Sequence, residues 1–485
     1  MSAMRIVIVG AGLVGTQLAK HLVQEKHDVS IIESDEERAR HASNHLDCMV
    51  IHDEGNSIKA LKDAGIARAD ALVCVTDSDE VNMIICGLAA SLFPDLLKIA
   101  RVRNDDYLQL KRQESADRRI LGIDHFIHPD VEASRSIINA IEHGALGDII
   151  SFSNTPYELG SIDVTPDSAF DGLGLKDYRS LVKEESLVTL VERNREVLLP
   201  SGSTVLAKGD RVHILANGRD MPRIFKFAGS TDKPIRKIGI VGGGKVGSLI
   251  AEGLVSKHGA FDKPDQQEKE KGKRNILFPL LRTLIPRNSR RIVIIEQDYK
   301  LCKELAARFP EALVLNEDIS DESFVTEEQL DDLDLLITTT NNQELNIITA
   351  VYLKSRGIAR TIAMVTGSGY AAMARQLGVD VVIPMKSVVV DSILSHLMGS
   401  GVKEVHRIGD GSVDIMEIEI GKDVPALDKP ISDLKFSAGG LVMLVNRDGN
   451  SFIPRGDYIF GRGDRIVLIA KTGSQAEVEK FFGPT

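Results

Sequence analysis

The chain opens with a short, largely apolar run, residues 4–9, that ends in a glycine-rich segment. Such a run bounded by glycine predicts a strand buried on both faces. Apolar positions then recur at helical spacing over residues 16–23, and a second apolar run, residues 29–32, ends in Glu33. Strands that alternate with helices in this order predict a parallel sheet of the Rossmann type.

The same order of elements returns later in the chain. Residues 237–241 predict a strand before a second glycine-rich segment, and residues 291–296 predict another strand that ends in an acid. The offset between the copies is 232 residues from Gly10 to Gly242 and 264 residues from Thr76 to Thr340. The difference predicts an insert over residues 257–290, with a solvated polar front. Its apolar tail either packs on its own domain or docks on a partner or a membrane face.

Each copy is followed by short apolar runs separated by glycine and proline. Residues 186–193 and 440–447 predict strands, and the spacing Pro-x-Gly-x6-Gly-Asp-Arg then follows at residues 200–211 and at residues 454–465. This pattern predicts small β-rich domains. The predicted domains are residues 1–128, 145–229, 234–384 and 402–485.

The predicted fold class is therefore α/β, with two Rossmann-like, doubly wound parallel sheets, each followed by a small β-rich α+β domain. Residues 130–143 and 388–398 have apolar positions at helical spacing. These helices are candidate dimer or hinge helices, and plain core packing is the alternative.

The first glycine segment reads Gly-x-Gly-x-x-Gly between a strand and a helix, with an acid about 20 residues further on. The first glycine permits a tight turn, the second lets backbone approach a pyrophosphate, and the third lets the helix pack on the sheet. The helix N-terminus then receives phosphate charge. The candidate nucleotide contacts of this loop are Gly10, Ala11, Gly12, Leu13, Val14 and Gly15.

Three further positions lie at the expected carboxyl edge of the first sheet. Glu33 can accept hydrogen bonds from ribose hydroxyls and would repel a 2′-phosphate, which favours NAD over NADP. Thr76 and Asp77 follow the fourth strand, where they either contact the ligand or cap the next helix. Arg101 ends the next strand and could reach a diphosphate, with a surface ion pair as the alternative.

The second copy keeps the loop but loses the cations. When Tyr107 is aligned with Tyr370, Arg101 falls opposite Met364 and Arg103 opposite Thr366, so the second copy lacks both arginines. We therefore expect weaker or different binding in the second half. Its candidate contacts are Gly242, Gly243, Gly244, Lys245, Val246 and Glu296.

Composition adds mainly exclusions. The formal charge of −11 disfavours nucleic acid as a partner. No stretch approaches the roughly 20 apolar residues of a membrane span, and the first strand begins too early for a signal peptide, so a cytoplasmic location is expected. The four cysteines form no Cys-x-x-Cys pair and are expected to be free thiols.

The chain offers no convincing catalytic set. We find no metal-ligand spacing and no nucleophile elbow, and His213 falls inside an apolar strand, where a packed or surface residue is expected. A ligand sensor is therefore favoured over an enzyme, and no catalytic or metal-binding residue is predicted.

The order of these motifs resembles the RCK (KTN) domains that regulate potassium conductance. The residues that carry it are Gly10–Gly15, Thr76–Asn82, Ile99–Arg103 and the Pro-x-Gly and Gly-Asp segments at residues 200–210. The tandem arrangement over nearly the whole chain is similar to the TrkA-type family, the peripheral regulatory subunits of Trk potassium uptake systems. The small domains would then be of the RCK C-terminal type.

The resemblance implies binding of NAD(H), with ATP or ADP as further ligands, in the Rossmann halves. It also implies an integral membrane, potassium-conducting Trk subunit as partner, self-association as a tetramer whose eight RCK units form a ring, and a peripheral position at the inner face of the cell membrane. A nucleotide that binds one ring shape more tightly would then gate the pore. The alternatives are a regulator of another cation transporter or antiporter and, with less support, an NAD-dependent oxidoreductase.

Overall fold

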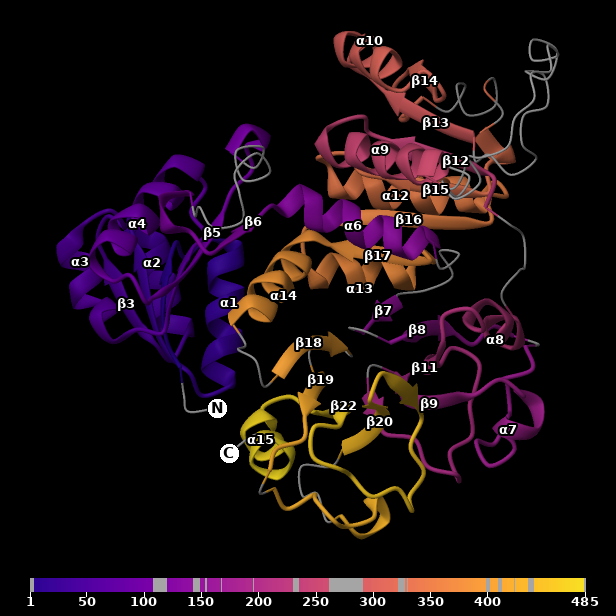
Figure 1. Ribbon diagram of the computed structural model, residues 1–485. Helices are drawn as coiled ribbons and strands as arrows, with labels where there is room; N and C mark the ends of the chain where they lie inside the picture. The colour runs from indigo at the N-terminus through magenta and orange to yellow at the C-terminus, as the bar shows by residue number, and fades with distance from the viewer. Residues whose placement is uncertain are drawn as a thin grey trace, which may run out of the picture. The chain divides into compact units, whose positions relative to one another are not determined.

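Figure 1 shows the computed structural model of the chain. It describes residues 4–107, 120–142, 149–152, 155–166, 168–194, 196–229, 235–260, 291–321, 328, 330–397, 402–408, 412–422, 424–434 and 440–483. The chain forms two compact units that do not follow chain order. Unit 1 combines Met1–Glu132, Ile149–Gly229 and Met385–Thr485, and unit 2 combines Ala133–Asp148 and Ser230–Pro384.

The first parallel sheet, in unit 1, has the strand order β3-β2-β1-β4-β5-β6. All neighbouring strands pair in parallel. The chain order reverses between β1 and β4, so the crevice at the carboxyl ends of these two strands is the place where such a sheet binds ligands. The strands are β1 (Arg5–Val9), β2 (Asp28–Glu33), β3 (Met49–His52), β4 (Ala71–Cys74), β5 (Leu97–Arg101) and β6 (His125–Ile127). The helices are α1 (Leu13–Gln24), α2 (Glu36–His45), α3 (Ile58–Asp63) and α4 (Asp79–Leu92).

The second parallel sheet, in unit 2, repeats this order as β14-β13-β12-β15-β16-β17, and again all neighbours pair in parallel. Its strands are β12 (Lys237–Val241), β13 (Arg291–Glu296), β14 (Leu313–Asn316), β15 (Leu335–Thr338), β16 (Arg360–Val365) and β17 (Val381–Pro384). Its helices are α9 (Lys245–Ala260), α10 (Tyr299–Arg308), α12 (Gln343–Ser355) and α13 (Ser368–Gln376). Because α9 extends to Ala260, the first residues of the predicted insert are helical, and residues 261–290 of the insert lie outside the described residues.

The two small sheets, both in unit 1, are antiparallel, with the orders β10-β9-β11-β8-β7 and β18-β19-β22-β20-β21. One apolar cluster contains side chains of both sheets, including Leu190, Leu215, Leu444 and Ile469, so the sheets share a core. The strands are β7 (Ile149–Ser151), β8 (Tyr157–Asp163), β9 (Ser186–Arg193), β10 (Glu196–Leu198), β11 (Arg211–Asn217), β18 (Val402–Ile408), β19 (Val413–Glu419), β20 (Gly440–Arg447), β21 (Asn450–Phe452) and β22 (Arg465–Lys471). The accompanying helices are α7 (Tyr178–Leu181), α8 (Met221–Phe227) and α15 (Gln475–Phe482). The predicted fold class is thus confirmed.

The two helices that follow the parallel sheets are exchanged between the units. Helix α6 (Pro129–Glu142) belongs to unit 2 from Ala133 onward, where a Cβ on Gly253 of α9 would lie 2.4 Å from Ile138 Cδ1. Helix α14 (Met385–Leu397) belongs to unit 1 and packs beside α1, with Ile393 and Leu22 in one buried cluster (Figure 1). The structure shows core packing of α14 within the chain, and the interpretation of both helices as dimer or hinge helices stays a prediction.

The aspartate of the repeated Gly-Asp-Arg motif holds a turn in each small domain. In the second, Arg447 at the end of β20, outside the motif, donates from Nε and Nη2 to the two oxygens of the motif's Asp464, both at 2.7 Å. The Gly461 backbone N–H and the Tyr458 hydroxyl also donate to this carboxylate, each at 2.8 Å. In the first, Arg193 makes the same paired contact with Asp210. The motif is therefore structural: it satisfies a buried carboxylate and fixes the turn.

We expect Asp464→Asn to lower the free energy of unfolding at pH 7 by about 2 kcal/mol, because charge-assisted hydrogen bonds to a buried group are lost. Burial by itself raises the pKa of Asp464, but the bonds from Arg447, Gly461 and Tyr458 outweigh it, so the pKa lies below its ordinary value. A lowered pKa gives stability that is present above the unfolded pKa of about 3.9 and is lost as the pH falls through the folded pKa. Denaturant unfolding at several pH values should show the difference between the variant and the wild type shrinking below about pH 4. A difference that grows on acidification would contradict this account.

Candidate nucleotide-binding sites

The first glycine loop has the geometry that its motif predicts. Gly10 has a φ of +106°, which an L side chain rarely adopts. A Cβ on Gly15 would lie 1.9 Å from the Gly10 carbonyl oxygen, whereas a Cβ on Gly12 would meet nothing within 4 Å. Gly10 and Gly15 are thus required by the protein itself. Gly12 is not, and its open surface fits the role of admitting a ligand close to the backbone.

Helix α1 starts from this loop without a side-chain cap. Its N-cap residue is Gly12, which has no side-chain oxygen, whereas α2 and α4 are capped by Asp35 and Ser78. An uncapped helix N-terminus leaves backbone N–H groups for an anion. Around it, Leu13 is exposed, Val14 is half-buried and Ala11 is buried. The N-terminus of α1 is therefore a candidate phosphate position.

Glu33 is buried, with 7% of its surface exposed, and turns toward the glycine loop. Its Oε2 accepts the Ala11 backbone N–H at 2.5 Å, and its Oε1 accepts the Asp35 backbone N–H at 2.9 Å. The carboxylate therefore ties the end of β2 to the loop. Each oxygen has a further lone pair, so the predicted contact with a ribose stays a prediction beside this bracing role.

The loop after β4 is held by Asn82, which is fully buried. Asn82 Oδ1 accepts from both the backbone N–H and the hydroxyl of Thr76, at 3.0 and 2.7 Å. Its Nδ2 donates to the carbonyls of Thr76 and Arg101, at 3.1 and 2.9 Å. Asn82 thus fixes Thr76 and Arg101, two of the predicted contacts, at the same edge of the sheet.

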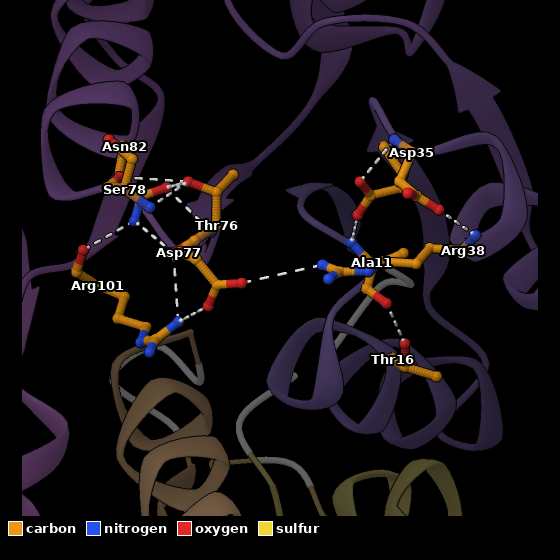
Figure 2. Close-up of polar contacts among 10 residues, drawn as sticks. Ala11, Thr16, Asp35, Arg38, Thr76, Asp77, Ser78, Asn82 and Arg101 are labelled. Carbon is orange, nitrogen blue, oxygen red and sulfur yellow. Dashed lines mark hydrogen bonds and ion pairs between the residues drawn. The ribbon is translucent and has the colours of Figure 1, made fainter.

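Figure 2 shows Asp77 between two arginines. Arg101 Nη1 donates to the Thr76 carbonyl at 3.2 Å and to Asp77 Oδ1 at 3.3 Å, and Arg38 Nη1 lies 3.9 Å from Asp77 Oδ2. Arg101 is only 7% exposed, and its Nε has no hydrogen-bond partner in the described part of the chain. Burial, followed by the charge of Arg103, lowers the pKa of Arg101, while Asp77 raises it. A buried cation with an unused donor at a ligand-binding edge favours an anionic ligand.

The second half repeats the loop geometry. Gly242 has a φ of +94°, a Cβ on Gly247 would lie 2.0 Å from the Gly242 carbonyl oxygen, and a Cβ on Gly244 would meet nothing within 4 Å. Glu296 accepts the backbone N–H groups of Gly243 and Asp298 at 2.8 and 2.9 Å. Lys245 and Val246 begin α9. The sequence-predicted residues of this half therefore also gather at one sheet edge.

The second half differs in its charges. Asn346 Nδ2 donates to the carbonyls of Thr340 and Met364, at 3.0 and 2.9 Å, just as Asn82 does in the first half. This equivalence confirms that Met364 stands in the place of Arg101. Along the same alignment, Leu301 replaces Arg38 and Asn341 replaces Asp77. The three charges that meet at Asp77 in Figure 2, those of Arg38, Asp77 and Arg101, are thus absent from the second half.

Sequence reasoning assigned no site role to Asn82, Asn346 and Arg38. The two asparagines carried a usable signal, since each follows its threonine by six residues in both copies. Arg38 carried none, because α2 is far from β4 in the sequence and only the fold brings it to Asp77.

His213 is buried and bonded on both ring nitrogens, to Ser161 Oγ and to Glu192 Oε1, each at 2.7 Å. Ser161 is itself buried, so this serine does not reach a substrate as a nucleophile must. Within the described ranges no group of three or more His, Cys, Asp or Glu could hold a metal ion. Likewise, no described helix is long and apolar enough to cross a membrane.

Comparison with known proteins places each half in a family. The TrkA-N domain matches residues 6–129 and 275–384, and the TrkA-C domain matches residues 159–229 and 415–483. The second TrkA-N match begins after the second glycine loop.

Relatives and solved structures match the whole chain. The Trk system potassium uptake protein TrkA homolog 1 of Methanosarcina mazei is 28% identical over 485 residues, which are 99% of this chain and 100% of the relative. The GsuK RCK domain and the GsuK channel bound to NAD are both similar in fold, at 16% identity and a TM-score of 0.54. Each covers 99% of this chain, with 94% of the RCK domain and 79% of the channel covered in turn. The chain carries TrkA-N and TrkA-C domains in tandem and belongs to the TrkA family of Trk system potassium uptake proteins, whose members match it over its full length.

Proposed function

We propose that the chain is a nucleotide-binding regulatory subunit that gates a membrane potassium uptake protein. The observation that carries this proposal is the buried Arg101, whose Nε has no hydrogen-bond partner in the described residues. It lies at the same sheet edge as α1, which starts from the glycine loop without a side-chain cap. The chain also carries TrkA-N and TrkA-C domains in tandem. A regulatory role rather than an enzymatic one is supported by the names of the full-length relatives, which are potassium uptake proteins.

The proposed ligand is NAD(H), with ATP or ADP as further ligands, and the first half is the stronger site. NAD is favoured because a solved structure of the same fold is described as bound to NAD. The diphosphate would lie at the N-terminus of α1, with Arg101 as its cationic partner. The second half lacks the three charges around Asp77, so we propose that it binds more weakly or takes a different ligand.

Self-association is supported by equivalent exposed faces. Ile84 of α4 and Ile348 of α12 occupy the same position of the repeat, and their side chains are 52% and 65% exposed. Leu92 and Leu121 in the first half, and Met373 and Leu377 in the second, are exposed as well. Apolar side chains repeated at solvent-facing positions favour an interface between copies. We propose a tetramer whose eight RCK units close a ring against the inner face of the cell membrane.

The test is to isolate the tagged full chain from native membranes. An integral potassium-conducting protein should copurify, and potassium flux through the purified assembly in vesicles should change with NADH, ADP or ATP. A partner that conducts another cation would favour a regulator of a different transporter. Hydride transfer from bound NADH to a small substrate would favour an oxidoreductase, and the absence of nucleotide binding would overturn the proposal.

A further inference from the structure

Arg38, Asp77 and Arg101, which are joined by dashed lines in Figure 2, come from three separate parts of the first parallel-sheet domain. Arg38 lies in the first turn of α2, Asp77 lies between β4 and α4, and Arg101 ends β5. The two oxygens of Asp77 are divided between the arginines, with Oδ1 at 3.3 Å from Arg101 and Oδ2 at 3.9 Å from Arg38. One anionic group with two oxygens is therefore enough to bridge both guanidinium groups.

The two arginines are poorly satisfied by Asp77 alone. The Asp77 side chain is 78% exposed, and exposed ion pairs contribute little stability. Arg101 is nine-tenths buried, and its Nε has no hydrogen-bond partner among the residues that the structure describes. Arg38 lies where the α2 helix dipole disfavours a cation. Arg38 is 55% exposed at its side chain and partly solvated, whereas the buried guanidinium of Arg101 would gain most from a ligand with more negative charge than one carboxylate.

The second half supports a joint role for the three residues. There, Leu301 replaces Arg38, Asn341 replaces Asp77 and Met364 replaces Arg101. The geometry of the glycine loop and the hydrogen bonds of Asn346 to Thr340 are kept. Because the three charged residues are all present in one copy and all replaced in the other, the simplest explanation is that they act together in one function.

We propose that Arg38 and Arg101 form a clamp for a phosphate group of the bound nucleotide, and that the Asp77 carboxylate fills this clamp until the phosphate displaces it. The ligand class is a nucleoside diphosphate or a dinucleotide, so the inference rests on the proposed function and adds Arg38 and a competing carboxylate to it. Asp77 then lowers the affinity for phosphate-bearing ligands instead of contributing to it.

The test is displacement of a fluorescent ADP analogue from the full chain by ADP, pyrophosphate and adenosine. Asp77→Asn should strengthen binding of ADP and pyrophosphate by about 2- to 5-fold, the order of one exposed ion pair, and leave adenosine unchanged. Arg38→Gln should weaken ADP binding by a similar factor. In the double variant the gain from Asp77→Asn should shrink, because one arm of the clamp is missing.

The matched control is Asn341→Asp, which places a carboxylate at the equivalent position of the half without arginines and should leave first-half binding unchanged. Weaker ADP binding by Asp77→Asn would show that Asp77 contacts the ligand directly, and unchanged binding would show that it does not compete; either result overturns the proposal while nucleotide binding itself stands. Unchanged ADP binding by Arg38→Gln would remove Arg38 from the clamp. A wild-type chain that binds no nucleotide would overturn the proposed function as well. Because Asp77 is exposed, Asp77→Asn should keep the wild-type unfolding midpoint.

Discussion

Arg101→Gln is expected to weaken NADH or ADP binding by the full chain about 100-fold, a cost of about 2.7 kcal/mol. The reason is that Arg101 is buried at the carboxyl edge of the first sheet, and Asn82 fixes its backbone beside the glycine loop. Charge-assisted bonds from a desolvated guanidinium to phosphate are among the stronger polar contacts in proteins. Isothermal titration of the wild type should show one strong site per chain, and the variant should lose that site.

The matched control is Met364→Gln, which changes the equivalent position of the second half. It should leave the strong site unchanged, because the second half lacks the arginines. Two equal sites in the wild type, or equal losses in the two variants, would contradict the assignment of strong binding to the first half. Thermal unfolding of Arg101→Gln should be checked in parallel, because removal of a buried side chain can also loosen the loop.

The fold and the inequality of its halves could be predicted because both depend on local pattern. Buried strands, glycine turns and the matched spacing from Glu54 to Thr76 and from Asp318 to Thr340 are properties of short segments. The pairing of Arg101 with Met364 followed from aligning the two copies, and the shared asparagine contacts confirm it.

What could not be predicted depends on side-chain direction and on contacts between distant segments. Both oxygens of Glu33 accept backbone N–H groups, one of them from the glycine loop, and the sequence did not indicate this bracing role beside the predicted ribose contact. A sequence does not state which of several nearby donors a carboxylate will meet. The sequence gives no sign that Arg38 of α2 lies near Asp77, because only the fold brings α2 to the loop after β4. The exchange of α6 and α14 between the units could not be predicted from the sequence either. A helix has the same spacing of apolar positions whichever sheet it covers.

Gly15→Ala and Gly12→Ala should separate folding from binding within one loop. A Cβ on Gly15 would collide with the Gly10 backbone carbonyl, so we expect this variant to lose about 3 kcal/mol of stability and nucleotide binding with it. A Cβ on Gly12 meets nothing, and Gly12 has an extended conformation (φ −69°, ψ −170°) that alanine adopts freely. Gly12→Ala should therefore keep the wild-type unfolding midpoint and weaken NADH binding by about tenfold or more, a cost of at least about 1.4 kcal/mol.

The contrast between these variants depends on the ligand approaching the loop backbone at Gly12. Gly244→Ala, at the equivalent open position of the second half, should change neither the unfolding midpoint nor the strong site. Gly247→Ala should destabilise the second half as Gly15→Ala destabilises the first, because its Cβ meets the Gly242 carbonyl at 2.0 Å. If Gly12→Ala binds NADH as tightly as the wild type, the ligand does not lie against this loop, and the clamp of Arg38 and Arg101 would have to hold it elsewhere along the sheet edge.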